Sequence, residues 1–272
     1  MLEQQLDLFA GAETSAPSPL PQGARPLVVT ADMDEGALLD AIPESSLGDS
    51  TMLAAEAGRR RLAAAIPALT ELCRRFAGFG VDRTVPEQAA ALTALADIGG
   101  RDAADAVAQF IERGVVCGPT LKIAVNSAAR LRARLSEGVL QALLQHADPA
   151  IRADTCRCSR PFSRVITRLI DLLNDIDQPV ARAAACALGQ MGRIEARPRI
   201  KSLLHNAPTK EVLDAAALIA DEEIIVLLGR IARAGLSLSG AALDALETID
   251  HPRASAIAAD VRRPSQPEGS AL

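Results

Sequence analysis

The chain has 272 residues and a net charge of −5, and 49% of its residues are hydrophobic, which is enough apolar material for a core without disulfides or metals. Aromatic residues make up only 2%, with no Trp or Tyr, and Ala and Leu dominate the apolar set, so the composition predicts an all-α fold. No stretch approaches the roughly 18 to 20 apolar residues of a membrane span, and the five Cys are too scattered for a disulfide framework, so we expect a cytoplasmic protein without membrane contact.

Near the amino end stands the pentapeptide Gln5-Leu6-Asp7-Leu8-Phe9. It resembles the peptide by which bacterial replication and repair proteins bind the DNA polymerase sliding clamp, whose usual form is Gln-Leu-Ser/Asp-Leu-Phe, and all five positions agree. The resemblance implies that Leu8 and Phe9 insert into an apolar groove of the clamp, that Gln5 hydrogen-bonds at its rim and that Asp7 shapes the turn. The alternative is that Leu6, Leu8 and Phe9 form an amphipathic start that packs on the rest of the chain.

Residues 10–46 are rich in Pro, Gly, Ser and acidic residues and show no sustained apolar period. Such a segment cannot bury enough apolar surface to offset its chain entropy. We therefore predict a disordered acidic linker over residues 10–46, between the clamp-binding peptide of residues 1–9 and a folded domain over residues 47–262. The polar residues 263–272 are predicted to form a disordered tail.

Between these ends the sequence repeats about every 30 residues, most clearly where residues 148–156 align with residues 178–186. Thirty residues accommodate two helices of about 12 residues and two short turns. One such hairpin cannot bury its apolar face alone, so the period predicts an α-solenoid of about six stacked hairpins. The hairpins are expected near residues 47–80, 85–116, 119–147, 149–177, 179–207 and 209–234, followed by a capping pair to about residue 262.

The repeat reads Asp-Pro-x-x-Arg, as from Asp148, followed by Ala-rich positions and Ala-Leu-Gly, as from Ala187. This pattern resembles the HEAT family, in particular the short bacterial HEAT-like units that also occur in phycobilin lyases. The resemblance implies a solenoid that serves as a binding surface, without specifying a function. Residues 157–161 read Arg-Cys-Ser-Arg-Pro in place of Ala-Leu-Gly, so the pattern gives no support for a regular first helix in that unit.

The middle of the chain is basic, with fourteen basic and seven acidic side chains in residues 122–201. Arg164 and Arg168 are four residues apart, as are Arg197 and Lys201, so each pair shares one face of a second helix, which we expect to line the concave side. We call these four residues the basic ladder. Three more residues complete a candidate site for phosphate groups or an acidic partner, namely Arg157, Arg160 and Arg193.

An alternative for this region is a solvated face whose cations pair with Asp171, Asp175 and Glu195. No aromatic residue is interleaved for base stacking. Any contact with DNA would therefore be directed at the backbone and would carry little sequence specificity.

The sequence gives no signal for a catalytic or metal centre. Cys156, Cys158 and His146 lack the paired spacing of structural zinc ligands, and Cys156 and Cys186 occupy equivalent repeat positions, as small core residues do. One HEAT-like family, the alkylpurine DNA glycosylases, is enzymatic, but it relies on Trp and Tyr around a catalytic Asp. We therefore expect a non-enzymatic protein without a cofactor.

These observations lead to the hypothesis of an adaptor in bacterial DNA replication or repair. Residues 5–9 would tether it to the sliding clamp, while the solenoid would hold a protein partner or the DNA backbone. The first alternative is a general protein-binding solenoid unrelated to DNA. The second alternative is a divergent HEAT-like DNA glycosylase.

Overall fold

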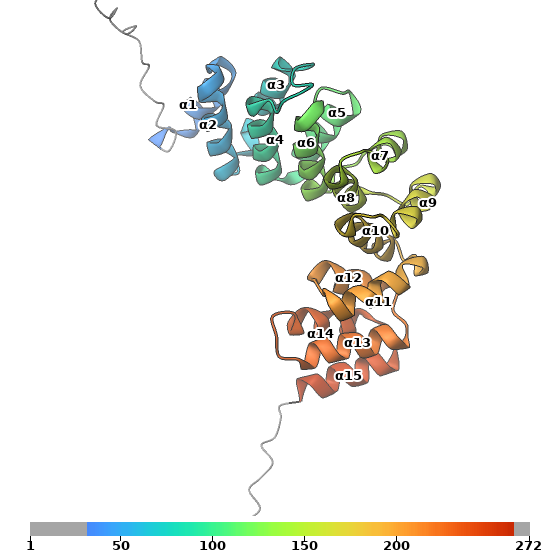
Figure 1. The fold of residues 1–272 in the computed structure, drawn as a ribbon. Coiled ribbons are helices and arrows are strands. Elements are labelled where there is room, and N and C mark those ends of the chain that lie inside the picture. The colour runs from blue at the N-terminus through green and yellow to red at the C-terminus, as the bar shows by residue number, and fades with distance from the viewer. Residues whose placement is uncertain (1–31, 264–272) are drawn as a thin grey trace, which may run out of the picture.

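The computed structural model describes residues 32–263 and shows an all-α protein (Figure 1). These residues form α-helices and short 3-10 turns and no β-strand, which confirms the fold class predicted from the Ala- and Leu-rich composition. After a single helix, α1 (Glu35–Glu44), the helices pair into consecutive hairpins. The pairs are α2 (Leu47–Arg59) with α3 (Ile66–Arg75), α4 (Pro86–Ile98) with α5 (Gly100–Glu112), α6 (Gly118–Leu131) with α7 (Glu137–Leu144), α8 (Pro149–Cys158) with α9 (Ser163–Leu172), α10 (Gln178–Gln190) with α11 (Arg197–Asn206), α12 (Lys210–Leu218) with α13 (Glu222–Arg233), and α14 (Ser239–Thr248) with α15 (Pro252–Arg262). The 3-10 helices η2 (Ala63–Ala65) and η3 (Ile194–Ala196) precede α3 and α11.

The hairpins coincide with the repeat units predicted from the 30-residue period. Each expected unit contains one pair, from α2 and α3 to α12 and α13, and α14 and α15 form the expected capping pair. The period identifies the units because each one holds both helices and their turns in a single local stretch of sequence. The prediction of an α-solenoid is confirmed.

The hairpins stack into an arc with two rows of helices (Figure 1). The first helices of the pairs lie along the inner, concave edge and the second helices along the outer edge; we call them the inner and outer rows. Small residues let the inner helices approach one another closely. A Cβ built on Gly58 of α2 would lie 2.7 Å from the Cα of Ala94 in α4, and one built on Gly189 of α10 would lie 2.9 Å from the Cβ of Ala215 in α12.

Helix α1 corrects the predicted linker, because residues 35–44 were expected to be disordered within residues 10–46. Leu38 and Ile42 lie one helical turn apart and are completely buried, where α1 packs on α2 and α3. Asp34 caps the helix by accepting a hydrogen bond from the amide of Ala37 at 2.8 Å. The acidic, Pro-containing sequence around this apolar pair does not predict a helix, because the helix becomes stable only when it packs against the first hairpin.

The unit that departs from the repeat pattern still has a regular first helix, α8. The helix is capped by Asp148, whose Oδ1 accepts from the amide of Ala150 at 2.8 Å. The departure falls at its carboxyl end, where Ser159 turns into an extended conformation and its hydroxyl donates to the carbonyl of Thr155 at 2.8 Å. The substitution of Ala-Leu-Gly therefore shortens α8 to 10 residues, against 13 in α10, and does not disrupt it.

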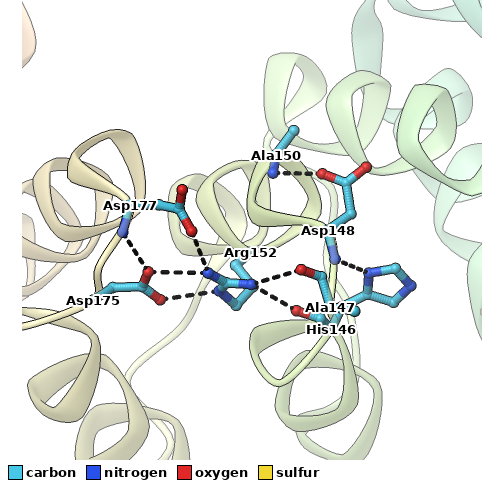
Figure 2. A network of polar contacts seen from close by, with 7 residues as sticks. All are labelled: His146, Ala147, Asp148, Ala150, Arg152, Asp175 and Asp177. Atoms are coloured by element: carbon cyan, nitrogen blue, oxygen red, sulfur yellow. Dashed lines mark hydrogen bonds and ion pairs between the residues drawn. The ribbon is translucent and has the colours of Figure 1, made fainter.

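One arginine ties two consecutive hairpins together (Figure 2). The guanidinium of Arg152 in α8 contacts Asp175 Oδ1 and Asp177 Oδ2, both at 3.0 Å, in the turn that leads to α10. Its Nη1 also donates to the carbonyls of His146 at 2.9 Å and Ala147 at 3.0 Å. Because Arg152 and Asp175 are nearly buried, this network fixes how the two units sit on each other.

Among the described residues, an equivalent ion pair occurs one repeat earlier but not one repeat later. Lys122 of α6 contacts Asp148 at 3.6 Å. Arg182 of α10 occupies the position equivalent to Arg152, but its buried Nε has no hydrogen-bond partner within residues 32–263. The repeat therefore conserves the basic position through three units and its acidic partner through two.

Candidate functional site

The structure places the predicted basic residues in two separate regions. Arg157 and Arg160 lie at the carboxyl end of α8, in the inner row, and line the same hollow. The basic ladder of α9 and α11 lies in the outer row (Figure 1), so the expectation that it lines the concave side was wrong. Helical spacing predicts which residues share a face, but it does not predict which row of helices faces inward.

The α11 half of the basic ladder is already occupied within the protein. Lys201 Nζ lies 2.9 Å from Asp221 Oδ2 and 2.5 Å from Glu223 Oε2, at the start of α13. These hydrogen bonds raise the pKa of Lys201. Arg197 donates to the carbonyls of Ile219 at 2.8 Å and Ala220 at 3.3 Å. Both cations therefore tie one hairpin to the next.

Two further cations of the predicted site have acidic neighbours. Arg168 lies 3.7 Å from Asp171, and Arg193 lies 2.6 Å from Glu195. Arg164 is exposed and has no ion pair or side-chain hydrogen bond in the part of the chain that the structure describes. These contacts favour the alternative of a solvated, internally paired outer face.

Unpaired cations gather instead at the carboxyl ends of the inner helices α6 and α8, beside the end of α10. Three hollows of about 410, 310 and 220 Å³ adjoin there, and all three are lined by Arg132. The largest also has Arg134 in its wall, and the two smaller ones share Arg157 and Gln190. This side of the solenoid is therefore a continuous, indented surface with Arg132 at its centre.

Arg132 has an uncommon backbone conformation. It ends α6 with φ at +51°, in the left-handed region, and the amide of Ala133 donates back to the carbonyl of Ala128 at 2.9 Å. The equivalent turn after α10 has Gly192 at φ +70°, the residue that this geometry favours. Arg132 was not among the predicted site residues, although an Arg where the repeat elsewhere has Gly was a signal present in the sequence.

The Arg132 side chain has no partner of its own. Neither it nor Arg134 or Arg160 has an ion pair or side-chain hydrogen bond within residues 32–263. Arg157, by contrast, lies 2.5 Å from Asp154 and 3.8 Å from Glu211. The surface thus combines three unpaired guanidiniums with one that is already held in place.

The described residues contain no arrangement typical of a metal site, since no group of three or more His, Cys, Asp or Glu side chains is close enough to hold an ion. Cys156 and Cys186 are buried, as expected for core residues. Burial raises the pKa of the Cys186 thiol to about 12, which makes it a poor nucleophile near neutral pH. No helix in this part of the chain is long and apolar enough to cross a bilayer.

A family model of HEAT repeats matches residues 136–220. This match runs from α7 to α12 and confirms the predicted resemblance for that part of the chain. The matched residues include α8 and α10, which line part of the indented surface around Arg132. No curated protein matches the sequence significantly.

Among solved structures, human deoxyhypusine hydroxylase in complex with glycerol is similar over 79% of this chain and 84% of its own, with 17% identity and a TM-score of 0.38. The crystal structure of an engineered protein, a structural genomics target, is similar over 79% of this chain and 98% of its own, with 19% identity and a TM-score of 0.36.

The predicted clamp-binding residues Gln5, Leu6, Asp7, Leu8 and Phe9 lie outside the described residues. Their role stays a prediction from the sequence.

Proposed function

We propose that this protein is a non-enzymatic adaptor that residues 5–9 tether to the bacterial DNA polymerase sliding clamp, in DNA replication or repair. The observation that carries the proposal is the agreement of Gln-Leu-Asp-Leu-Phe with the clamp-binding peptide at all five positions. The α-solenoid supports a role in protein interaction generally, because stacked repeats present long continuous surfaces. The solenoid would then hold a protein partner near the clamp.

The energetics suit a reversible tether. Burial of Leu8 and Phe9 in an apolar groove contributes roughly 1.5 to 3 kcal/mol for each side chain. Ordering the peptide opposes part of this gain, so we expect a dissociation constant of about 1 µM, or about −8 kcal/mol. Such an affinity permits exchange with other clamp-binding proteins.

Fluorescence anisotropy with purified bacterial sliding clamp tests the proposal, using a labelled peptide of residues 1–14 and the full chain as competitor. We expect saturable binding, and loss of competition when the chain carries Leu8→Ala and Phe9→Ala. The matched control carries Leu27→Ala and Val28→Ala, two apolar truncations outside the pentapeptide, and should compete like the original chain. Absence of saturation by about 100 µM clamp would exclude the tether.

The second candidate is a protein-binding solenoid unrelated to DNA. It is favoured by the acidic residues among the cations of the inner row, such as Glu211 and Asp214, which a uniformly negative backbone would meet unfavourably. Binding of the full chain to random duplex DNA across a salt series separates the candidates, because phosphate contact gives a steep loss of affinity with salt. Release of a base from alkylated duplex DNA would instead indicate the glycosylase alternative.

A further inference from the structure

We propose that the inner surface around Arg132 binds an acidic segment of a partner protein. We call this surface, formed by Arg132, Arg134, Arg157, Arg160 and Lys210, the Arg132 surface. The proposal rests on the adaptor function above and specifies the chemistry of the partner that the solenoid holds. It concerns residues that lie apart from the clamp-binding peptide in the sequence.

Arg132 shares its left-handed backbone with Arg61, and only at Arg132 does this turn lie among the three hollows, so conformation and position together support a role other than folding. A left-handed φ is uncommon in residues other than Gly and strains an L side chain, so a turn selected for stability alone would carry Gly, as at Gly192. Strained residues of this kind are concentrated at functional sites. The turn holds an exposed, unpaired guanidinium at the point where the three hollows meet.

Charge supports an anionic ligand. Arg132, Arg134 and Arg160 have no acidic partner within residues 32–263, although the whole chain carries a net charge of −5. Their positions after the ends of inner helices place them near the partial negative charge of helix carboxyl termini, which lets them gather without carboxylates. A ligand with carboxylates can add bidentate hydrogen bonds that the free protein does not make.

The acidic residues in the same walls favour a polypeptide over nucleic acid. Asp105, Glu211 and Asp214 line the hollows beside the cations. A phosphate backbone is negative throughout its length and would be repelled at these places, whereas a peptide can present carboxylates to the arginines and neutral or basic side chains to the acids. The walls also contain no aromatic residue on which a base could stack.

The repeat supplies a matched control at Arg61. Arg61 ends the turn after α2 with φ at +55°, and the amide of Leu62 donates to the carbonyl of Ala57 at 3.1 Å, as Ala133 does to Ala128 after α6. The substitutions Arg132→Gly and Arg61→Gly therefore remove the same side chain from the same backbone geometry. Because Gly suits both turns, neither substitution should impair folding.

The test uses the full chain and a fluorescein-labelled octapeptide of alternating Glu and Ser residues, whose neutral positions can lie beside the acids of the walls. Its binding is followed by anisotropy at low and high salt. We expect saturable binding at low salt, binding about tenfold weaker for Arg132→Gly, and unchanged binding for Arg61→Gly. Arg160→Ala should also weaken binding, while Arg164→Ala in the outer row should not. Circular dichroism of each variant should show the original helical signal.

Three results would overturn the proposal. These are no saturable binding of the Glu-Ser peptide, equal losses for Arg132→Gly and Arg61→Gly, and tighter binding of a mixed-sequence DNA duplex that Arg132→Gly weakens, which would assign the surface to nucleic acid. The Leu8→Ala and Phe9→Ala chain should bind the Glu-Ser peptide normally. Failure of the clamp tether and failure of the Arg132 surface are thus distinguishable.

Discussion

Arg157 of α8 and Glu211 of α12 form an ion pair of 3.8 Å although a complete hairpin separates them in the chain. The contact crosses the carboxyl end of α10, so the arc is bent sharply enough at this point for alternate inner helices to meet. Both side chains are more than a third exposed. Such pairs contribute about 0 to 1 kcal/mol to the free energy of unfolding. The contact is therefore a consequence of the curvature and not its main cause.

A double-mutant cycle with Arg157→Ala and Glu211→Ala should therefore give a coupling free energy below about 1 kcal/mol, which falls further at high salt. Urea unfolding of the four proteins measures this coupling. A coupling of several kcal/mol would mean that the pair, and not the packing of α10, sets the bend.

The Arg152 network should contribute much more to stability. Removal of Arg152 leaves Asp175, which is 8% exposed, without its main partner. We expect Arg152→Ala to lower the free energy of unfolding by about 3 kcal/mol, since breaking a buried pair leaves an uncompensated charge. Lys122→Ala is the control, because Lys122 and Asp148 form the equivalent but exposed pair and should lose less than about 1 kcal/mol. If Arg152→Ala and Lys122→Ala lowered the free energy of urea unfolding by similar amounts, the burial of the network would not explain its contribution to stability.

Gln88 should be the most sensitive polar residue of the first two hairpins. Its buried Nε2 donates to the carbonyls of Cys73 and Phe76, both at 3.1 Å, and of Val115 at 3.3 Å. Gln88→Leu leaves these carbonyls unsatisfied, so we expect a loss of about 2 to 3 kcal/mol in urea unfolding. Gln88→Glu should be at least as damaging, because its carboxylate would face three acceptors. The exposed Gln145→Leu should change stability by less than about 0.5 kcal/mol.

The hydrogen bonds of Glu56 should make the stability of the protein fall at acidic pH. Hydrogen bonds from Arg59 and Arg60 lower the pKa of Glu56 from 4.5 to about 2. A carboxyl group whose pKa is lowered by folding stabilises the protein above its unfolded pKa, and this stabilisation disappears as the pH falls from about 4.5 towards 2. Glu56→Gln should therefore flatten the decline of stability over that range, measured by urea unfolding at several pH values. Glu71→Gln, at an exposed glutamate, should leave the decline unchanged, and an identical profile for Glu56→Gln would contradict the prediction.

In the turns after α6 and α10, exchanging a larger residue for Gly and Gly for a larger residue should have opposite effects on stability. Arg132→Gly should raise the free energy of unfolding by up to about 1 kcal/mol, because φ of +51° then costs no strain. Gly192→Ala should lower it by about 1 kcal/mol, since φ of +70° is unfavourable for a Cβ. Thermal unfolding of both variants measures the effects. A lower stability for Arg132→Gly would mean that the arginine side chain supports the fold.

The sequence predicts the hairpins well and the binding surface poorly, for physical reasons. A repeat unit is local, so its period can be read along the chain, as in the alignment of residues 148–156 with residues 178–186. Helix α1 is hidden because Leu38 and Ile42 are buried only once the first hairpin exists to cover them. The role of the basic ladder depends on which row faces inward and on the carboxylates of the next hairpin, such as Asp221, and neither follows from spacing.

The near-complete burial of α10 limits what this helix itself can offer to a ligand on the inner surface. Every residue from Val180 to Gly189 except Arg182 is buried, because α8, α9, α11 and α12 pack around this helix. A ligand at this point must therefore contact the long side chains that line the neighbouring hollows. A narrow, extended stretch of polypeptide, with side chains small enough for hollows of about 220 to 310 Å³, would fit between the neighbouring units.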